Sequence, residues 1–403
     1  MSAATTPDLN RIALVDPSDF TPPYDLALAG AIQAEGCQVR LVGQAGQSSD
    51  APRFHYGHFY PILASPLGRR LPDRGARLVK GACHGIDMLR LFRWLVTFGA
   101  GIVHFQWSPL PPIDRWTIRL LQQQLPVVLT LHDSNPYQGG ASWLMRQGYA
   151  SLLHIFNAII VHTEQARDRI VAMGVNPTLI YRIPHGLLGL SSNPVTFLVP
   201  RSDRGRLVLL QFGKIKPYKG VDMLLEALTL VPEHLRDRLD VRIVGKPYMD
   251  TAGFEQFIHA NGLARCVTLR SEFVSKGEEE RLFAEAGAIV LPYRDIDASG
   301  VAMSAIARGV PVLATAIAGF RELFEDEGGA HLVPPGDSAA LAKAITDWIN
   351  APAQLRALAE GMRLRQTRIP SWNEIARRHL AVYIEARARW FAHRSQKTAC
   401  LSR

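Results

Sequence analysis

The stretch AIVLPYRDIDASGVAMSAIARGVPVLAT, residues 288–315, begins and ends with a short apolar run and holds a third apolar segment between them. The runs AIVLPY (288–293) and PVLAT (311–315) carry no charge, as is typical of strands buried on both faces of a parallel sheet. Between them, Ser299 precedes an apolar segment without proline, which predicts a helix with Ser299 as its N-cap. Strand, helix and strand in this order predict a βαβ unit.

Similar runs occur on both sides of this stretch. They lie at residues 11–16, 38–42, 101–105, 126–131, 158–162 and 179–183, and again at 206–212, 240–245, 266–270 and 330–334. The segment between the two sets, residues 184–206, is rich in proline, glycine and serine and is interpreted as a linker. We therefore expect an α/β protein with two Rossmann-like domains facing a central cleft, residues 1–190 and 191–370.

The last part of the chain reads as one amphipathic helix. Ile375, His379, Val382 and Tyr383 recur at helical spacing within residues 371–390. We expect residues 371–403 to pack back on the first domain.

The composition is that of an ordinary globular protein, with 403 residues, 47% hydrophobic residues and a net charge of +9. Four well-separated cysteines without histidines at ligand spacing argue against a zinc site or a disulfide framework. The amino terminus lacks a signal-peptide pattern, and the apolar stretch 94–107 is too short to span a bilayer, which favours a cytoplasmic location. The positive charge indicates an anionic partner.

Several ways of binding anions are excluded by missing motifs. Neither a P-loop signature nor a G-x-G-x-x-G fingerprint after the first strand is present, which argues against a P-loop NTPase and a tightly bound dinucleotide. Basic and aromatic residues do not alternate as in a base-stacking surface, so we do not expect nucleic acid as a partner.

A loop with three lysines follows the first strand of the second half. In QFGKIKPYKG, residues 211–220, Lys214, Lys216 and Lys219 come directly after a predicted strand end at Phe212. Ammonium groups at the carboxyl end of a strand could bind phosphate. A solvated basic loop is the alternative.

The helix start at Ser299 is a second candidate for anion binding. The amides of Gly300, Val301 and Ala302 would face an anion, and together with Lys214 and Lys219 they would hold a diphosphate. Asp295 and Asp297 would then accept hydrogen bonds from a sugar. They could instead simply favour the positive end of the helix.

These residues resemble the retaining nucleotide-sugar glycosyltransferases of family 4, which have the GT-B fold. GKIKPYKGVDMLLEAL (213–228) resembles the family's glycine- and lysine-containing block, and residues 288–315 resemble its donor-sugar block. IAGFRELFEDEGGAHLVPPGD (317–337) and SWNEIARRHLAVY (371–383) also match. The amino-terminal half matches loosely, through GIVHF, TLHD and IPHG.

The resemblance implies roles for particular residues. Gly213, Lys214 and Lys219 would bind the donor diphosphate, as would Ser299, Gly300 and Val301, while His132 in TLHD would lie near the reacting sugar. Taken alone, a histidine at this place is more often a core residue that is hydrogen-bonded at a strand end.

The donor-sugar block departs from the family pattern at both of its glutamates. Ser304 stands in place of the second, which removes a carboxylate from the ribose. Asp297 stands in place of the first, and Asp295 is the reserve candidate. The second position is counted back from Pro311 and the first from Ser299–Gly300, and these two alignments differ by one residue.

The implied activity is transfer of a hexose from a nucleoside diphosphate sugar to a saccharide or lipid-linked saccharide, in exopolysaccharide, cell-surface glycan or glycolipid synthesis. It would proceed with retention. It would need no metal or other cofactor, because lysines and helix amides supply the positive charge. A nucleotide-sugar 2-epimerase and a non-catalytic nucleotide-sugar-binding protein are the alternatives.

The surplus basic charge is concentrated in residues 69–93, RRLPDRGARLVKGACHGIDMLRLFR, where it alternates with apolar residues. This pattern predicts peripheral contact with an anionic membrane at the inner face of the cell membrane. The alternative is a solvated helix face.

Overall fold

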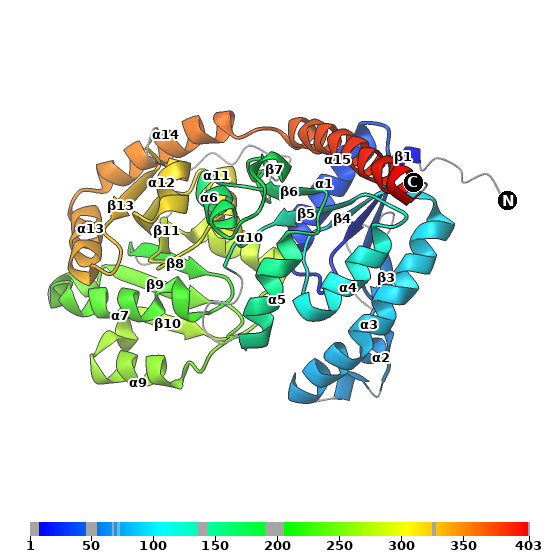
Figure 1. Cartoon of the computed structure of the whole chain (residues 1–403). Helices are drawn as coiled ribbons and strands as arrows, with labels where there is room; N and C mark the ends of the chain where they lie inside the picture. The colour runs from blue at the N-terminus through cyan, green and yellow to red at the C-terminus, as the bar shows by residue number, and fades with distance from the viewer. Residues whose placement is uncertain are drawn as a thin grey trace. The chain divides into compact units, whose positions relative to one another are not determined.

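In the computed structural model, which describes residues 8–45, 55–66, 68–70, 73–135, 143–189, 205–324 and 328–401, the chain divides into two compact units. Unit 1 comprises Met1–Pro184 and Pro370–Arg403, and unit 2 comprises His185–Ile369. We expected the boundary after residue 190, and residues 190–204 lie outside the described part of the chain. Each unit is built around its own sheet (Figure 1).

Unit 1 contains a seven-stranded parallel sheet in the order β3-β2-β1-β4-β5-β6-β7. Its strands are β1 (Asp8–Val15), β2 (Gln38–Gln44), β3 (His55–Phe59), β4 (Ala100–Phe105), β5 (Val127–Leu131), β6 (Ala158–Val161) and β7 (Ile180–Arg182). The strand order reverses between the neighbours β1 and β4. Ligands of open α/β sheets bind at the carboxyl edge of such a reversal.

Helices cover both faces of this sheet. α1 (Pro22–Ala34) and α15 (Trp372–Leu401) pack on one face, and α3 (Asp73–Phe98), α4 (Pro111–Leu121), α5 (Trp143–Leu153) and α6 (Glu164–Ala172) pack on the other. The short helix α2 (Pro61–Ala64) follows β3. Ile375, His379, Val382 and Tyr383, which share one face of α15, are all buried, so the carboxy-terminal helix is part of the core of unit 1.

Unit 2 repeats this architecture with six parallel strands in the order β10-β9-β8-β11-β12-β13. These are β8 (Leu207–Phe212), β9 (Leu239–Val244), β10 (Val267–Arg270), β11 (Ala288–Leu291), β12 (Val312–Thr315) and β13 (Ala330–Val333). α7 (Val221–Leu230), α8 (Glu233–Arg236), α9 (Ala252–Ala260) and α13 (Ser338–Asn350) pack on one face, and α10 (Lys276–Glu285), α11 (Gly300–Ala307) and α12 (Ala318–Phe324) on the other. α14 (Pro352–Arg368) contributes to both cores. Here the order reverses between β8 and β11.

The two parallel sheets confirm the predicted fold class of two Rossmann-like α/β domains, and every predicted strand is present. The strand that the sequence did not predict is β3. Its sequence, HYGHF, contains the strand-favouring residues Tyr and Phe, but it has no β-branched residue and its centre is a glycine, so it does not form the continuous apolar run by which the other strands were predicted. It forms at the edge of the sheet by pairing in parallel with β2.

Candidate functional site

Two parts of unit 2, the lysine loop after β8 and the first turn of α11, meet where the strand order reverses. A Cβ placed on Gly213, just after β8, would lie 3.2 Å from Nζ of Lys219 and 3.4 Å from Cγ2 of Val301. Gly213 therefore lies against both the lysine side chain and the first turn of α11. Its φ of +100° also favours glycine. The structure thus brings Lys219 of the lysine loop next to the helix start, the two parts that are expected from the sequence to hold one diphosphate.

The Lys219 side chain is buried, with 9% of its surface exposed. Its ammonium lies 4.9 Å from the centroid of the Tyr293 ring, and among the described residues it has no carboxylate partner. Burial lowers the pKa of Lys219 from 10.5 to about 8. A buried charge without a counter-ion is unfavourable, so this environment favours binding of an anion.

The backbone around Lys219 fixes the position of its side chain. Pro217–Lys219 form a single 3-10 turn, and the Gln211 side chain donates a 2.8 Å hydrogen bond to the Lys219 carbonyl. Gly220 follows with a φ of +66°, and a Cβ there would lie 2.0 Å from the Pro292 carbonyl oxygen. Only glycine fits at this approach of the turn to the end of β11.

Ser299 is the N-cap of α11, because its hydroxyl accepts a 3.2 Å hydrogen bond from the Ala302 amide. This corrects one sequence expectation, since the Ala302 amide is occupied by the cap and does not face an anion. The first backbone bond of the helix runs from the Met303 amide to the Ser299 carbonyl. The amides of Gly300 and Val301 thus precede the helical ladder and remain available for a ligand.

Asp295 and Asp297 lie in the loop between β11 and α11. Asp297 is 2% exposed and Asp295 is half-buried. A Cβ on Gly319 would come within 2.4 Å of the Ile296 carbonyl oxygen, so this loop packs closely against the start of α12. Ser304, which replaces the family's second glutamate, is buried within α11.

Lys214 has a different environment from Lys219. Its ammonium lies 5.8 Å from the ring centroid of Tyr248, an exposed residue after β9, and Lys216 lies at the same distance from that ring. The structure thus directs Lys214 to Tyr248, whereas Lys219 lies on Tyr293.

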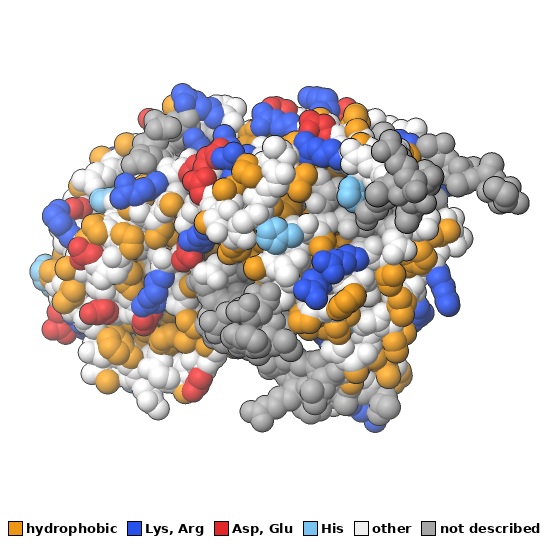
Figure 2. Space-filling view, viewed as in Figure 1, with side chains coloured by type: hydrophobic (Ala, Val, Ile, Leu, Met, Phe, Trp, Pro, Cys, Tyr) orange, Lys and Arg blue, Asp and Glu red, His pale blue; other side chains and the backbone are white. Residues whose placement is uncertain are grey.

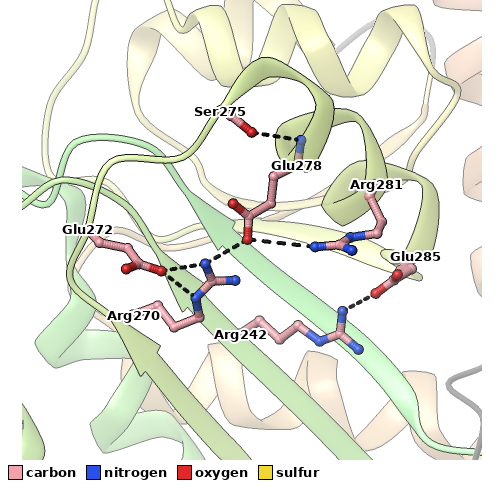
Figure 3. Close-up of polar contacts among 7 residues, drawn as sticks. All are labelled: Arg242, Arg270, Glu272, Ser275, Glu278, Arg281 and Glu285. Atoms are coloured by element: carbon pink, nitrogen blue, oxygen red, sulfur yellow. Dashed lines mark hydrogen bonds and ion pairs between the residues drawn. The ribbon is translucent and has the colours of Figure 1, made fainter.

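An ion-pair network holds the loop that follows β10 (Figure 3). Arg270 donates a 2.9 Å bond to Glu272 and a 2.6 Å bond to Glu278, which join the two ends of the loop. Ser275 caps α10 at the end of the same loop. Between these contacts, Phe273 is 80% exposed, so a large aromatic ring is presented to solvent by a loop fixed at both ends.

In unit 1, His132 follows β5 and is 9% exposed. Its Nε2 lies 3.1 Å from Oε1 of Gln106 and its Nδ1 lies 3.2 Å from Nε2 of His162. The Tyr24 and His132 rings pack at nearly right angles, with their centroids 4.7 Å apart. Both ring nitrogens are therefore engaged within unit 1. His132 and Asp297, both of which are expected from the sequence to lie near the transferred sugar, belong to different units.

At the strand reversal of unit 1, two aromatic rings stack. Phe20, after β1, and Trp107, after β4, have centroids 4.4 Å apart and nearly parallel planes. Beside Phe20, burial and the charge of Asp16 raise the pKa of Asp19 from 3.8 to about 7. Aromatic rings and a carboxyl group are side chains that can contact a polyol ring, and both occur in the loops after β1 and β4.

Residues 73–93 of the predicted basic segment belong to α3, while residues 71–72 and several basic side chains before Lys80 lie outside the described structure. Apolar side chains are exposed on α3 beside Arg90 and Arg93, and on α4 Trp116 lies under Arg115 and Arg119. Figure 2 shows hydrophobic side chains gathered over α3. Within the described ranges, no helix is long and apolar enough to cross a membrane.

Several of these residues were not predicted from the sequence. Tyr293 could have been identified, because it ends the predicted strand 288–293 at the same edge as the lysine loop. Gln106 and His162 also follow strands, but their pairing with His132 depends on side-chain directions that the sequence does not give.

Two family models match the chain. The model described as "Glycosyltransferase Family 4" matches residues 26–187, and that described as "Glycosyl transferases group 1" matches residues 206–351. Together they span most of the chain.

Among similar proteins is a phosphatidyl-myo-inositol mannosyltransferase of Mycobacterium leprae, 28% identical over 389 residues that cover 93% of this chain and 96% of the relative. Among solved structures, a sucrose-phosphate synthase of Thermosynechococcus elongatus matches with a TM-score of 0.72 and 19% identity, covering 94% of this chain and 99% of that one. Anabaena HepE in complex with UDP-glucose matches with a TM-score of 0.69 and 15% identity, covering 93% and 99%. These structures show that the chain has the fold of GT-B proteins.

Proposed function

The chain belongs to the family 4 glycosyltransferases, and from this premise we propose that it transfers a hexose from a nucleoside diphosphate sugar to a saccharide or lipid-linked saccharide. The observation that carries the donor assignment is the buried ammonium of Lys219 beside Gly213 and Val301. Departure of a nucleoside diphosphate creates negative charge, which preorganised positive groups stabilise. Lys219 and the amides of Gly300 and Val301 supply such groups.

We propose the remaining contacts with the donor from the positions of four further side chains in unit 2. Asp297 would bind a sugar hydroxyl, with Asp295 as the reserve candidate. Lys214 would contact the outer side of the diphosphate. Phe273 offers a face on which the nucleobase can stack, and the solved complex of HepE with UDP-glucose supports a uridine nucleotide as the first donor to test.

We propose that the acceptor binds unit 1, where its saccharide ring would stack on Phe20 and Trp107 and Asp19 would bind its hydroxyls. His132 would contact the transferred sugar. The name of the M. leprae relative, a phosphatidyl-myo-inositol mannosyltransferase, supports a lipid-linked acceptor and a role in glycolipid or cell-surface glycan synthesis. The exposed apolar and basic side chains of α3 and α4 support peripheral contact with an anionic membrane from the cytoplasmic side.

Transfer would proceed with retention and without a metal, with Lys219 and the helix amides supplying the positive charge that a metal provides elsewhere. The test is product analysis with a panel of UDP- and GDP-hexoses, with and without saccharide and lipid acceptors, in buffer containing a chelator. We expect an α-linked product that needs an acceptor. Conversion of donor alone would favour an epimerase, and strict dependence on added divalent metal would contradict the proposed leaving-group stabilisation.

Lys219→Met should abolish transfer, whereas Lys343→Met should not. Lys343 is an exposed lysine paired with Asp347 on α13, far along the chain from the lysine loop. Equal activity of both variants would contradict the role of Lys219.

A further inference from the structure

His132 belongs to a series of buried, hydrogen-bonded side chains in unit 1 that the donor and acceptor assignments do not explain. It runs from His162 through His132 and Gln106 to His104, and from His104 to Tyr383 on α15. All five residues are less than 10% exposed. The far end is fixed, because His104 lies 2.6 Å from the Tyr383 hydroxyl and 2.7 Å from that of Thr130.

The direction of the bonds begins at His162. Its Nδ1 lies 2.9 Å from the Ile183 carbonyl, which can only accept, so Nδ1 of His162 carries a proton. Burial lowers the pKa of His162 to about 4, which keeps the ring neutral near pH 7. Its Nε2 is then unprotonated and accepts a hydrogen bond.

The partner of that Nε2 is Nδ1 of His132, at 3.2 Å. Because His162 accepts, His132 must donate from Nδ1. The other nitrogen of His132, Nε2, faces the Gln106 side-chain amide at 3.1 Å. A half-turn of that amide exchanges its oxygen and nitrogen. Gln106 can therefore accept a hydrogen bond from a protonated Nε2 or donate one to an unprotonated Nε2.

We propose that His162 is a positioning residue that keeps the proton of neutral His132 on Nδ1, which leaves Nε2 as a hydrogen-bond acceptor for a sugar hydroxyl that displaces Gln106. The part concerning the sugar rests on the proposed function. The part concerning the proton stands on the contacts within unit 1. Gln106 keeps Nε2 satisfied until the sugar arrives.

The proton position can be measured without activity. In the full chain labelled with 15N-histidine, and with His132→Gln used to assign the signals, the shifts should show His132 protonated at Nδ1 and unprotonated at Nε2 near neutral pH. His162→Phe removes the acceptor and should shift the protonation toward Nε2, while His162→Gln provides an acceptor oxygen and should preserve it. His259→Phe, at an exposed histidine of α9, is the control.

A wild-type ring protonated at Nε2, or an unchanged ring in a folded His162→Phe variant, would overturn the proposal. In transfer assays, His162→Phe should lower kcat by about 10- to 100-fold with little change in donor KM, and His162→Gln should recover most of the loss. If the NMR result holds while His132→Gln retains full transfer activity, the contact of His132 with the sugar is wrong and the proton assignment stands.

Discussion

Lys219 combines two properties that oppose each other, burial and positive charge. In the free protein its ammonium contacts the Tyr293 ring, which compensates only part of the lost hydration. A diphosphate would supply the missing opposite charge. On the proposed assignment, Lys219 would contribute to ligand binding at the expense of the stability of the ligand-free protein.

Replacement of Lys219 by methionine tests this opposition directly. A pKa lowered from 10.5 to about 8 corresponds to roughly 3 kcal/mol of unfavourable burial at neutral pH. Lys219→Met should thus leave the ligand-free protein at least as stable as wild type in urea unfolding, while its affinity for a nucleoside diphosphate falls by about 100-fold or more in calorimetry. A variant that unfolds more easily and binds normally would contradict the account.

The affinity should also depend on pH. Between pH 8 and 10.5 the unfolded chain binds more protons at this lysine than the folded one, so the contribution of Lys219 to stability rises with pH across this window. Diphosphate affinity should fall as the pH rises above 8, because the ammonium loses its proton. Calorimetric titrations from pH 7 to 10 check this, and Lys219→Arg, which keeps its charge, should flatten the profile.

The sequence predicted these contacts only where strand ends fix them. Lys219 and Val301 both follow strands of the second domain, so a position at the same edge of its sheet could be predicted, but the fact that these two strands are neighbours comes from the structure. The Tyr293 ring and the divergence of Lys214 toward Tyr248 depend on side-chain rotamers. The Ala302 amide was assigned wrongly because the serine that starts the helix also occupies that amide.

At the scale of the element, the first turn of α11 has two separable tasks. Ser299 stabilises the helix as its N-cap, and the amides of Gly300 and Val301 are proposed to bind an anion. A side chain that keeps the cap but adds negative charge should affect only the second task.

Ser299→Asn and Ser299→Asp form the matched pair for this test, with Ser299→Ala as the variant without a cap. Ser299→Ala should lose about 1 kcal/mol of stability. Asn and Asp should both retain the cap, but Asp should weaken diphosphate binding by about 10-fold or more because its charge repels the ligand. Thermal unfolding and calorimetry measure the two effects, and equal binding by Asn and Asp variants would argue against an anion at this turn.

Secondary structure could be predicted well because parallel strands buried on both faces form continuous apolar runs. β3 was missed for the converse reason, since HYGHF forms a strand through pairing with β2 at the sheet edge. The order of the strands, and hence the reversals at β1/β4 and β8/β11, comes from the structure.

At the scale of the whole molecule, the proposed membrane contact predicts lipid-dependent binding. The full chain should sediment with vesicles containing phosphatidylglycerol and not with phosphatidylcholine alone, and binding should weaken as salt is raised. The double variant Leu89→Ser/Trp116→Ser should lose binding. Leu230→Ser is a matched control, because Leu230 is 54% exposed and Leu89 is 53% exposed. Binding that survives the double variant would place the contact elsewhere.

The measurement that tests the central claim most directly is calorimetric binding of a nucleoside diphosphate and its bare nucleoside to wild type and to Lys219→Met. The account predicts that wild type binds the diphosphate of at least one nucleoside, binds that nucleoside at least 100-fold more weakly, and loses this preference when Lys219 is replaced. Equal affinity for the two ligands in wild type, or an unchanged preference in the variant, would show that Lys219 and the start of α11 do not form the diphosphate site.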